Sequence, residues 1–273
     1  MKYLQLTAAI LIPVTIIFSV AACQVTDEPT VQETSRMDII FDTDANNEVD
    51  DQHALAYLLF SGDHFNLLGV TVNATSGPGG FDDPSTIQEH YDEARRIMQL
   101  CGELYGEIPL LKGAGASFVE IRDSVQNGLF DGADAVNFII EEAMKERDDK
   151  LVLLPLGKLT NIALALEKEP AIADNVRIVW LGSNYPETGE HNKVWDKESV
   201  NYLLNQDVEL EFVTVRYGDP SGTDAVKVTQ AQMLHRMPGL GPVISEPIVG
   251  RNGGEFNNLF HLHELFFCHC VFA

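Results

Sequence analysis

Residues 39–59 read IIFDTDANNEVDDQHALAYLL. The short β-branched run at the start of this stretch predicts a buried strand, and the apolar spacing at its end predicts a helix. Between the two lie five carboxylates within ten residues, those of Asp42, Asp44, Glu48, Asp50 and Asp51. This stretch is therefore expected to be one strand–helix unit of a chain in which strands and helices alternate.

The same alternation continues beyond this unit. Short apolar runs predict strands at 37–41, 67–74, 151–156, 176–182 and 208–215. Helical patterns lie at 51–62, 85–102, 134–147, 159–170 and 197–206. This order predicts an α/β fold, an open and mostly parallel sheet flanked by helices. Ligands of such folds bind beyond the carboxyl ends of the strands, which is where the acidic segment lies.

Composition limits the classes of partner. The chain has 273 residues, of which 45% are hydrophobic and 22% are charged, so it is globular and long enough for a large core. Its formal net charge of −23 repels the phosphates of nucleic acids and anionic membrane surfaces. A nucleic-acid partner is therefore not expected.

The N-terminus has the pattern of an export signal. Lys2 precedes an apolar stretch at 8–20, and small residues then end at Cys23 in VAAC. This ending resembles a bacterial lipoprotein signal, in which the cysteine is acylated, and simple cleavage with release is the alternative. We expect an exported protein on the periplasmic side, anchored to the outer membrane through Cys23. The expected segments are a signal at 1–23, a polar tether at 24–36 and one domain at 37–273, atypical from about residue 257.

Three cysteines remain if Cys23 carries lipid, namely Cys101, Cys268 and Cys270. An odd number excludes a complete disulfide framework. The last two form a CHC sequence, which without a second pair is weak evidence for a metal site.

Crowded carboxylates at one strand end repel one another, so a cation or protonation must offset their charge. Oxygen ligands without cysteine favour Ca²⁺ or Mg²⁺, and Ca²⁺ takes six to eight oxygens, so other loops must contribute. A simpler interpretation also holds for this segment alone. Asp50 and Asp51 would then cap the helix while Asp42 and Glu48 face water.

Three segments in fixed order, IIFDTD with the following DD, LLPLGKLTNIALAL, and GSNYPETGEHNKVWDKESV, together resemble the nucleoside hydrolase family of the inosine-uridine-preferring type. The resemblance covers most of residues 37–215. It implies an α/β fold, a Ca²⁺ cofactor and hydrolysis of the N-glycosidic bond of ribonucleosides.

The resemblance also implies roles for individual residues. Asp44 would be the general base and a Ca²⁺ ligand, and Asp51 a second ligand. The main-chain carbonyl of Leu156 would be a third ligand. Asp50 would hold the ribose hydroxyls.

The third segment matches the family's sugar-binding residues in spacing, and these are Asn184, Glu190, His191 and Asn192. His191 stands where the family has a phenylalanine. Asn73, at a neighbouring strand end, would contact the sugar or form a turn. The apolar stripe of the helix at 159–170 is expected to account for all of its side chains. Trp180 and Trp195 are expected to pack in the core, and the alternative for Trp195, which lies close to Asn192, is to line the pocket.

Two departures from the family pattern affect the expected site. Five residues, ANNEV, separate DTD from DD where the family has three that often begin with Pro-Gly, so Asn46, Asn47 and Glu48 are candidates to take part. The tail LFHLHELFFCHCVFA contains no aspartate where the family supplies its last Ca²⁺ ligand. His261, His263 and Glu264 are candidates to replace it, and a truncated or frameshifted end is the alternative.

Three functions remain open from the sequence. The first is a Ca²⁺-dependent hydrolase of ribonucleosides or a related glycoside, and the second is a nucleoside- or sugar-binding lipoprotein without turnover. The third is an inactive, truncated family member. A small-molecule nucleoside or glycoside is the expected partner, with a membrane contact only through Cys23. The sequence names neither the base nor the oligomeric state, and a homo-oligomer is compatible with it.

Overall fold

The computed structural model describes most of the chain between residues 36 and 256. The described ranges are 36–47, 49–74, 87–102, 106–216 and 221–226, together with 232, 235, 248–249 and 255–256. The expected export signal and tether up to residue 35, Glu48, and the tail from residue 257 with its cysteine, histidine and glutamate candidates lie outside the described residues.

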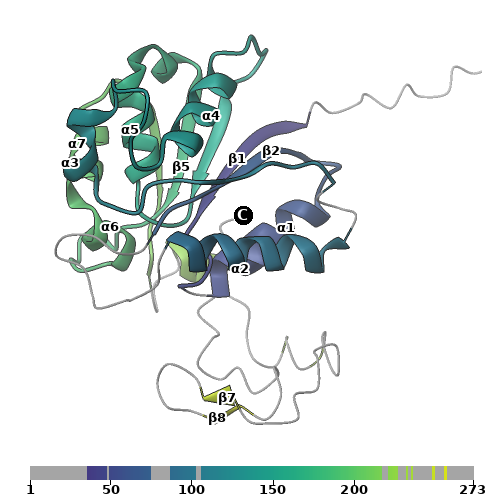
Figure 1. The fold of residues 1–273 in the computed structure, drawn as a ribbon. Coiled ribbons are helices and arrows are strands. Elements are labelled where there is room, and N and C mark those ends of the chain that lie inside the picture. Colours follow the sequence, from purple (N-terminus) through teal and green to yellow (C-terminus); the bar gives the residue numbers. More distant parts are fainter. Residues whose placement is uncertain are drawn as a thin grey trace, which may run out of the picture. The chain divides into compact units, whose positions relative to one another are not determined.

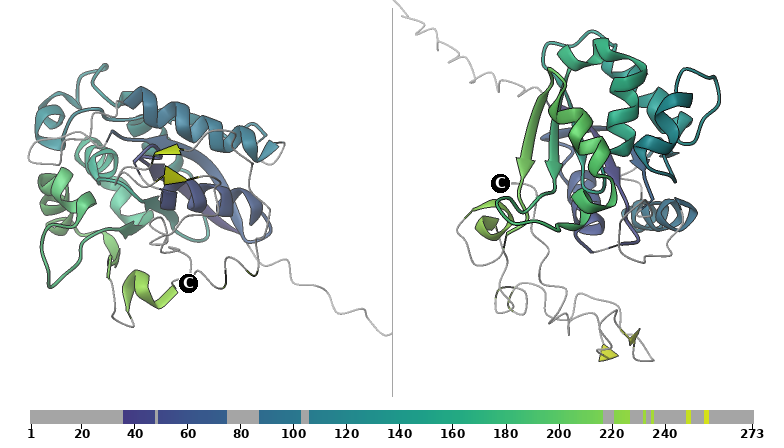
Figure 2. Two further views of the ribbon diagram at one scale, coloured as in Figure 1. Left: turned by 90° about the horizontal axis from the view of Figure 1, so that it is seen from below. Right: turned by 90° about the vertical axis from the view of Figure 1, so that its left-hand side faces the viewer.

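Six parallel strands form one sheet in the order β3-β2-β1-β4-β5-β6 (Figure 1). Their bounds are β1 Met37–Thr43, β2 Phe65–Val72, β3 Leu110–Lys112, β4 Leu151–Pro155, β5 Val176–Leu181 and β6 Glu209–Val213. In the right-hand view of Figure 2, the green strand β6 forms an edge of this sheet. The predicted fold class and five predicted strands are confirmed. β3 was not predicted, because its three residues are too few to show a pattern.

Helices connect these strands. The α-helices are α1 Val49–Phe60, α2 Ile87–Leu100, α3 Phe118–Ile121, α4 Ala133–Ala143, α5 Thr160–Lys168, α6 His191–Trp195 and α7 Lys197–Leu204. Short 3₁₀ helices are η2 Arg122–Ser124, η3 Pro170–Asp174 and η4 Gly222–Val226. Two short strands, β7 Ile248–Val249 and β8 Glu255–Phe256, pair antiparallel. The five predicted helices are confirmed, and α3 and α6 were not predicted.

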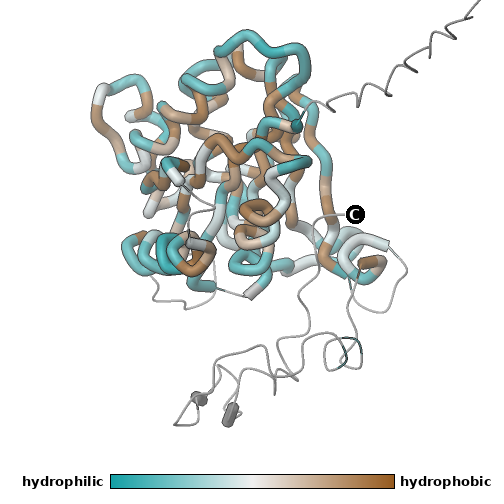
Figure 3. Tube along the Cα trace, turned by 90° about the vertical axis from the view of Figure 1, so that its right-hand side faces the viewer, coloured by the Kyte–Doolittle hydropathy of each residue, from teal (hydrophilic) through white to brown (hydrophobic). Residues whose placement is uncertain are grey.

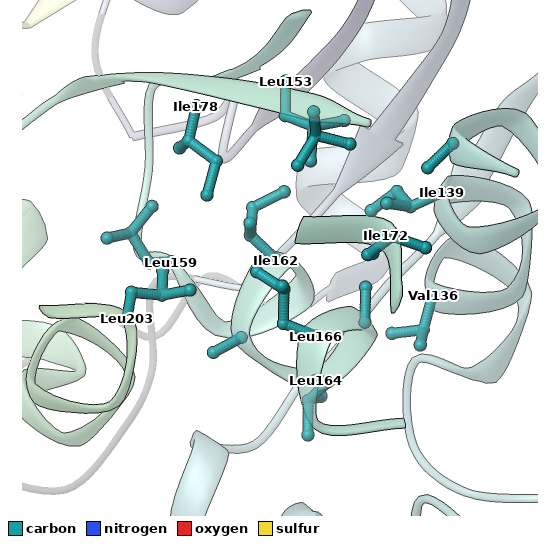
Figure 4. Packing of buried hydrophobic residues seen from close by; sticks show 14 of the residues in the cluster. Val136, Ile139, Leu153, Leu159, Ile162, Leu164, Leu166, Ile172, Ile178 and Leu203 are labelled. Carbon is teal, nitrogen blue, oxygen red and sulfur yellow. The ribbon is translucent and has the colours of Figure 1, made fainter. Parts of the chain in front are cut away.

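The two faces of the sheet bury different sets of helices, because neighbouring residues of a strand point to opposite faces. Ile39 and Phe41 pack in a cluster with residues of α1 and α2, whereas Ile40 belongs to a cluster with residues of α3, α4, α5 and α7. Figure 4 shows this second cluster, in which Leu153 of β4 and Ile162 of α5 lie among the buried side chains. Packing on both faces fixes the position of each strand, and therefore of the residues that follow its carboxyl end.

The helices that cover the sheet differ in how much of their surface is buried, since α5 is buried all round over residues 160–166 whereas α2 buries one face. Hydrophobic and hydrophilic residues alternate along them in Figure 3. In α2, for example, Ala94, Ile97 and Met98 are buried, and this spacing is that of a helix with one face toward the core. Over the described residues, no helix combines the length and the apolar character needed to cross a membrane.

The order of the strands places four carboxyl ends side by side, and the row that these ends form is the carboxyl edge of the sheet. β2, β1, β4 and β5 are successive neighbours and run parallel. The residues that follow them include Asn73 after β2, Asp44 after β1, Leu156 after β4 and Asn184 after β5. Predicted site residues from four distant parts of the sequence therefore share one edge.

Candidate active site

Asp42, the last residue but one of β1, is buried. It accepts three hydrogen bonds from uncharged groups. Its Oδ2 accepts from Thr71 Oγ1 at 2.6 Å and from Asn161 Nδ2 at 2.7 Å, and its Oδ1 accepts from Asn73 Nδ2 at 2.6 Å. Burial raises the pKa of Asp42 to about 6, while the three hydrogen bonds lower it and the charge of Asp44 raises it. Asp42 thus holds the ends of β1 and β2 and the start of α5 together.

Asp44 follows β1 directly, is buried, and faces the backbone of Gly157. A Cβ atom on Gly157 would lie 2.9 Å from Asp44 Oδ1 and 3.0 Å from Asn73 Oδ1. Such contacts are too close for a real side chain, so position 157 has room only for hydrogen. The expected base, the candidate sugar contact Asn73 and the strand end at Leu156 are therefore brought together.

Asp50 and Asp51 lie in the first turn of α1, which begins at Val49, and not at the capping position before it. Asp51 is buried and accepts a hydrogen bond from Thr43 Oγ1, whereas Asp50 is half-buried. Carboxylates in a first turn interact favourably with the helix dipole. Both residues are therefore placed to stabilise the start of α1, and Asp51 is also hydrogen-bonded to Thr43 at the end of β1.

The carbonyl of Leu156, the expected third metal ligand, lies at the end of β4. Its own N–H donates to the carbonyl of Asp42 at 2.9 Å. Asn192 Nδ2 donates to the Leu156 carbonyl and, at 2.9 Å, to the carbonyl of Leu181. Asn192 therefore bridges the ends of β4 and β5, and a carbonyl oxygen keeps a second lone pair for another partner.

Glu190 is the residue that caps α6 and it organises the segment around it. Its Oε1 accepts from the N–H of Asn192 at 2.8 Å, and its Oε2 accepts from the N–H of Ser183 at 2.7 Å and of Lys193 at 2.9 Å. Burial raises the pKa of Glu190, while these backbone hydrogen bonds lower it and the charge of Asp44 raises it. These contacts are internal to the protein, and a contact of Glu190 with sugar stays a prediction.

Two buried amide oxygens are open at this edge. Within the described part of the chain, Oδ1 of Asn73 and Oδ1 of Asn184 have no hydrogen-bond partner. The Nδ2 of Asn73 donates to the carboxylate of Asp42, so the opposite orientation of this amide is excluded. A buried acceptor without a donor costs about 1–3 kcal/mol. Both oxygens are therefore suited to accept from the hydroxyls of a ligand.

His191, the first residue of α6, contacts the loop after β1. Its Nε2 lies 2.9 Å from the side-chain amide of Asn47, and its Nδ1 accepts from Trp195 Nε1 at 3.2 Å. Trp195 is buried as expected, and so is Trp180, whose Nε1 donates to the carbonyl of Gly157 at 2.9 Å.

The expectation that packing accounts for every side chain of the helix at 159–170 is wrong. Asn161 donates through Nδ2 to Asp42 and, at 3.2 Å, to the carbonyl of Val72, and its Oδ1 accepts from the N–H of Ala114 at 2.8 Å. Thr160 Oγ1 donates to Asp196 Oδ2 at 2.6 Å. Asn161 is a polar residue in an otherwise mostly apolar helix. This polarity was the sequence signal that could have marked Asn161 as part of the site.

Lys158 was not predicted either. It is 1% exposed, and its Nζ donates to the carbonyl of Ala116 at 3.1 Å. Burial lowers the pKa of Lys158, while the charges of Asp196 and Asp44 raise it. A fully buried lysine is rare unless it is paired, so this ammonium offsets part of the negative charge at the edge.

The donors at this edge suit a hard cation in kind but are few in number. Asp44, Asp51 and the Leu156 carbonyl all offer oxygen, which Ca²⁺ and Mg²⁺ prefer. Over the ranges that the structure covers, no three His, Cys, Asp or Glu side chains gather into a group able to hold a metal ion. Backbone carbonyls, water and ligand hydroxyls would have to complete such a site.

Comparisons with known proteins agree with this geometry. The family model described as inosine-uridine preferring nucleoside hydrolase matches residues 39–249. The inosine-uridine preferring nucleoside hydrolase of Crithidia fasciculata is 33% identical over 125 residues, which are 44% of this chain and 37% of that protein. The non-specific ribonucleoside hydrolase RihC of Salmonella paratyphi A is 26% identical over 198 residues, 65% of this chain and 60% of that protein.

Among solved structures, the purine-preferring ribonucleoside hydrolase from Gardnerella vaginalis has a similar fold. The TM-score is 0.54 at 24% sequence identity, with 71% of this chain and 64% of that chain covered. The matched part of the chain thus spans less than two thirds of the length of these relatives. The family match covers the four strand ends described above, and the chain belongs to the inosine-uridine preferring nucleoside hydrolase family.

Proposed function

We propose that this protein hydrolyses the N-glycosidic bond of ribonucleosides and depends on Ca²⁺ for this reaction. The relatives are named as hydrolases of inosine, uridine or other ribonucleosides, and the polar groups at the four strand ends support the proposal. Substrate is the nucleoside as a small molecule.

The observation that carries the proposal is the pair of open amide oxygens on Asn73 and Asn184. Each can accept a directional hydrogen bond, and a ribose offers several hydroxyl donors. Asn73 comes from the end of β2 and Asn184 follows β5. Asp50, at the start of α1, adds a carboxylate acceptor for the same hydroxyls.

Asp44, Asp51 and the carbonyl of Leu156 would hold the Ca²⁺ ion. When bound there, such an ion would supply positive charge for sugar hydroxyls and would make a nearby water more acidic. Asn192, which donates to the Leu156 carbonyl, fixes the direction of that carbonyl. Because Gly157 has no side chain, the side chains of Asp44 and Asn73 can both lie against its backbone.

The side chains then divide the work. Asp44 takes a proton from the water that attacks the anomeric carbon, a step typically worth about 10²- to 10⁴-fold in rate. The C–N bond breaks, its electron pair leaves with the base, and the sugar acquires positive charge in the transition state. Carboxylates held in place at this edge stabilise that charge without reorganisation.

The test is release of free base and reducing sugar from a panel of purine and pyrimidine ribonucleosides and simple glycosides. The assay is run with added Ca²⁺ and after exhaustive chelation. Base release that disappears on chelation and returns with Ca²⁺ supports the proposal. Calorimetric binding of a nucleoside without base release would replace it by the non-catalytic binding protein. Neither binding nor turnover would identify an inactive family member.

A further inference from the structure

The loop between β1 and α1, here residues 44–47, is fastened by two histidines that come from distant helices. The N–H of Asn46 donates to Nδ1 of His90 in α2 at 3.1 Å. The side-chain amide of Asn47 lies 2.9 Å from Nε2 of His191 in α6. His90 and His191 are 44 and 144 residues away from their partners, so both contacts depend on the complete fold.

The contacts of His191 determine which ring nitrogen carries the proton. The indole N–H of Trp195 can only donate, and it donates to Nδ1 at 3.2 Å, so Nδ1 holds a lone pair. A neutral imidazole then carries its proton on Nε2. The structure has Nδ2 of Asn47 at 2.9 Å from this nitrogen. Because a half-turn exchanges the oxygen and nitrogen of a side-chain amide, we infer that Asn47 presents its Oδ1 to the proton on Nε2.

A continuous chain of donors follows from this tautomer. Trp195 donates to His191 and His191 donates to the side chain of Asn47. The backbone N–H of Asn47 in turn donates to the carbonyl of Asp44 at 2.8 Å. The rings of His191 and Trp195 meet edge to face, with centroids 5.5 Å apart and an interplanar angle of 64°. Trp195 thus orients the imidazole through Nδ1, and the imidazole contacts Asn47 through Nε2.

We propose that His191 is a positioning residue for Asp44. Its imidazole holds the loop between β1 and α1 through Asn47, and so holds the carboxylate of Asp44 at its place beside Gly157. This inference rests on the function proposed above for its kinetic consequence. The hydrogen-bond chain itself does not depend on that function.

A set of substitutions separates the two contacts. His191→Phe keeps an aromatic ring but removes both hydrogen bonds, whereas His191→Gln retains a polar group at the reach of Nε2. Asn47→Ala removes the same contact from the loop side. His64→Phe is the matched control, because the side chain of His64 is 71% exposed.

The kinetic readout is a split between kcat and KM. We expect His191→Phe to lower kcat roughly tenfold while KM stays within about twofold, since a displaced base slows the reaction more than it weakens binding. His191→Gln should recover most of kcat, and the double variant with Asn47→Ala should be no worse than His191→Phe alone. A change confined to KM, or losses that add in the double variant, would overturn the inference.

A second readout needs no activity. Exchange of the Asn47 backbone amide with deuterium should be about fivefold faster in His191→Phe than in the wild type, and unchanged in His64→Phe. The ¹⁵N spectrum of the wild type should show an unprotonated Nδ1 on His191. If no nucleoside is cleaved but exchange and spectrum are as expected, the proposed function fails while the fastening stands. Unchanged exchange in His191→Phe rejects the fastening even if nucleosides are cleaved.

Discussion

β1 carries one aspartate near each end, and the two differ in their partners: Asp38 is paired with a charged group, whereas Asp42 is bound by uncharged groups. At the amino end, Asp38 Oδ2 accepts from Arg147 Nε at 2.9 Å and its Oδ1 accepts from Asn66 Nδ2 at 2.7 Å. Arg147 also pairs with Glu142 at 2.9 Å. At the carboxyl end, Asp42 is bound by hydroxyl and amide groups without a formal charge.

The difference separates a structural use of carboxylates from a functional one. A guanidinium paired with two carboxylates cancels most of the electrostatic field that could attract a cation. Neutral donors, by contrast, orient a carboxylate without neutralising its charge. At the carboxyl end, the buried ammonium of Lys158 offsets part of this charge from Asp44 and Asp42. The remaining negative field is suited to a cation and to a sugar that becomes positive during reaction.

The largest expected effect is on turnover. Asp44→Asn keeps the shape of the side chain and an oxygen ligand but removes the base, so base release should fall by about 10²- to 10⁴-fold. Nucleoside affinity should stay within about tenfold, as measured by calorimetry. Asp63→Asn, whose side chain is 78% exposed, is the matched control and should be fully active. Undiminished turnover in Asp44→Asn would remove the catalytic assignment.

Next is a difference in stability between the two ends of β1. Asp42→Asn places an NH₂ group against donors that need an acceptor, so the free energy of unfolding should drop by about 3 kcal/mol. Asp38→Asn also sets an NH₂ group against a donor, but the Asp38 side chain is 29% exposed, so water can hydrogen-bond the mismatched groups and the loss should be only about 1 kcal/mol. Urea unfolding of both variants measures the comparison. Equal losses would mean that the neutral donors at Asp42 have no special importance.

A smaller effect concerns the ion. Calcium at about one hundred times its Kd should stabilise the wild type by about 2.7 kcal/mol, because it binds only the folded state. Asp51→Ala should lose most of this increment, together with bound calcium. Thermal unfolding with and without Ca²⁺, and calcium content by elemental analysis, measure both. A calcium content that is unchanged would leave Asp51 as a stabiliser of the start of α1 alone.

The smallest effect is expected among exposed charges near the amino ends of β5 and β6. Arg177 pairs with Glu209 at 3.3 Å and also contacts Glu211, and all three side chains are at least 38% exposed. Arg177→Gln should therefore change the free energy of unfolding by only about 0.5 kcal/mol, and less at high salt. A loss comparable to that of Asp42→Asn would contradict the contrast between exposed and buried charges.

Sequence patterns predicted the strands that carry the site, because β1 and β4 are apolar runs buried on both faces. The motif resemblance selected Asp44 at the end of β1, and its place at a strand end selected Asn73 after β2. The fold brings these two together beside Gly157. The partners of Asp42 could not be predicted, since Thr71 and Asn161 are 29 and 119 residues away in the sequence. Such pairs depend on strand order and register, which no local pattern contains.

Asn161 has a consequence for how the site comes into being. Its side chain reaches Asp42 across 119 residues of sequence, the carbonyl of Val72 across 89 and the N–H of Ala114 across 47. These three bonds form only when β1, β2 and the segment after β3 have all assembled with α5, so the hydrogen bonding of Asp42 depends on contacts between parts of the chain that are far apart in sequence. Through Asn161, the segment that follows the edge strand β3 is thus joined by hydrogen bonds to Asp42 in the central strand β1.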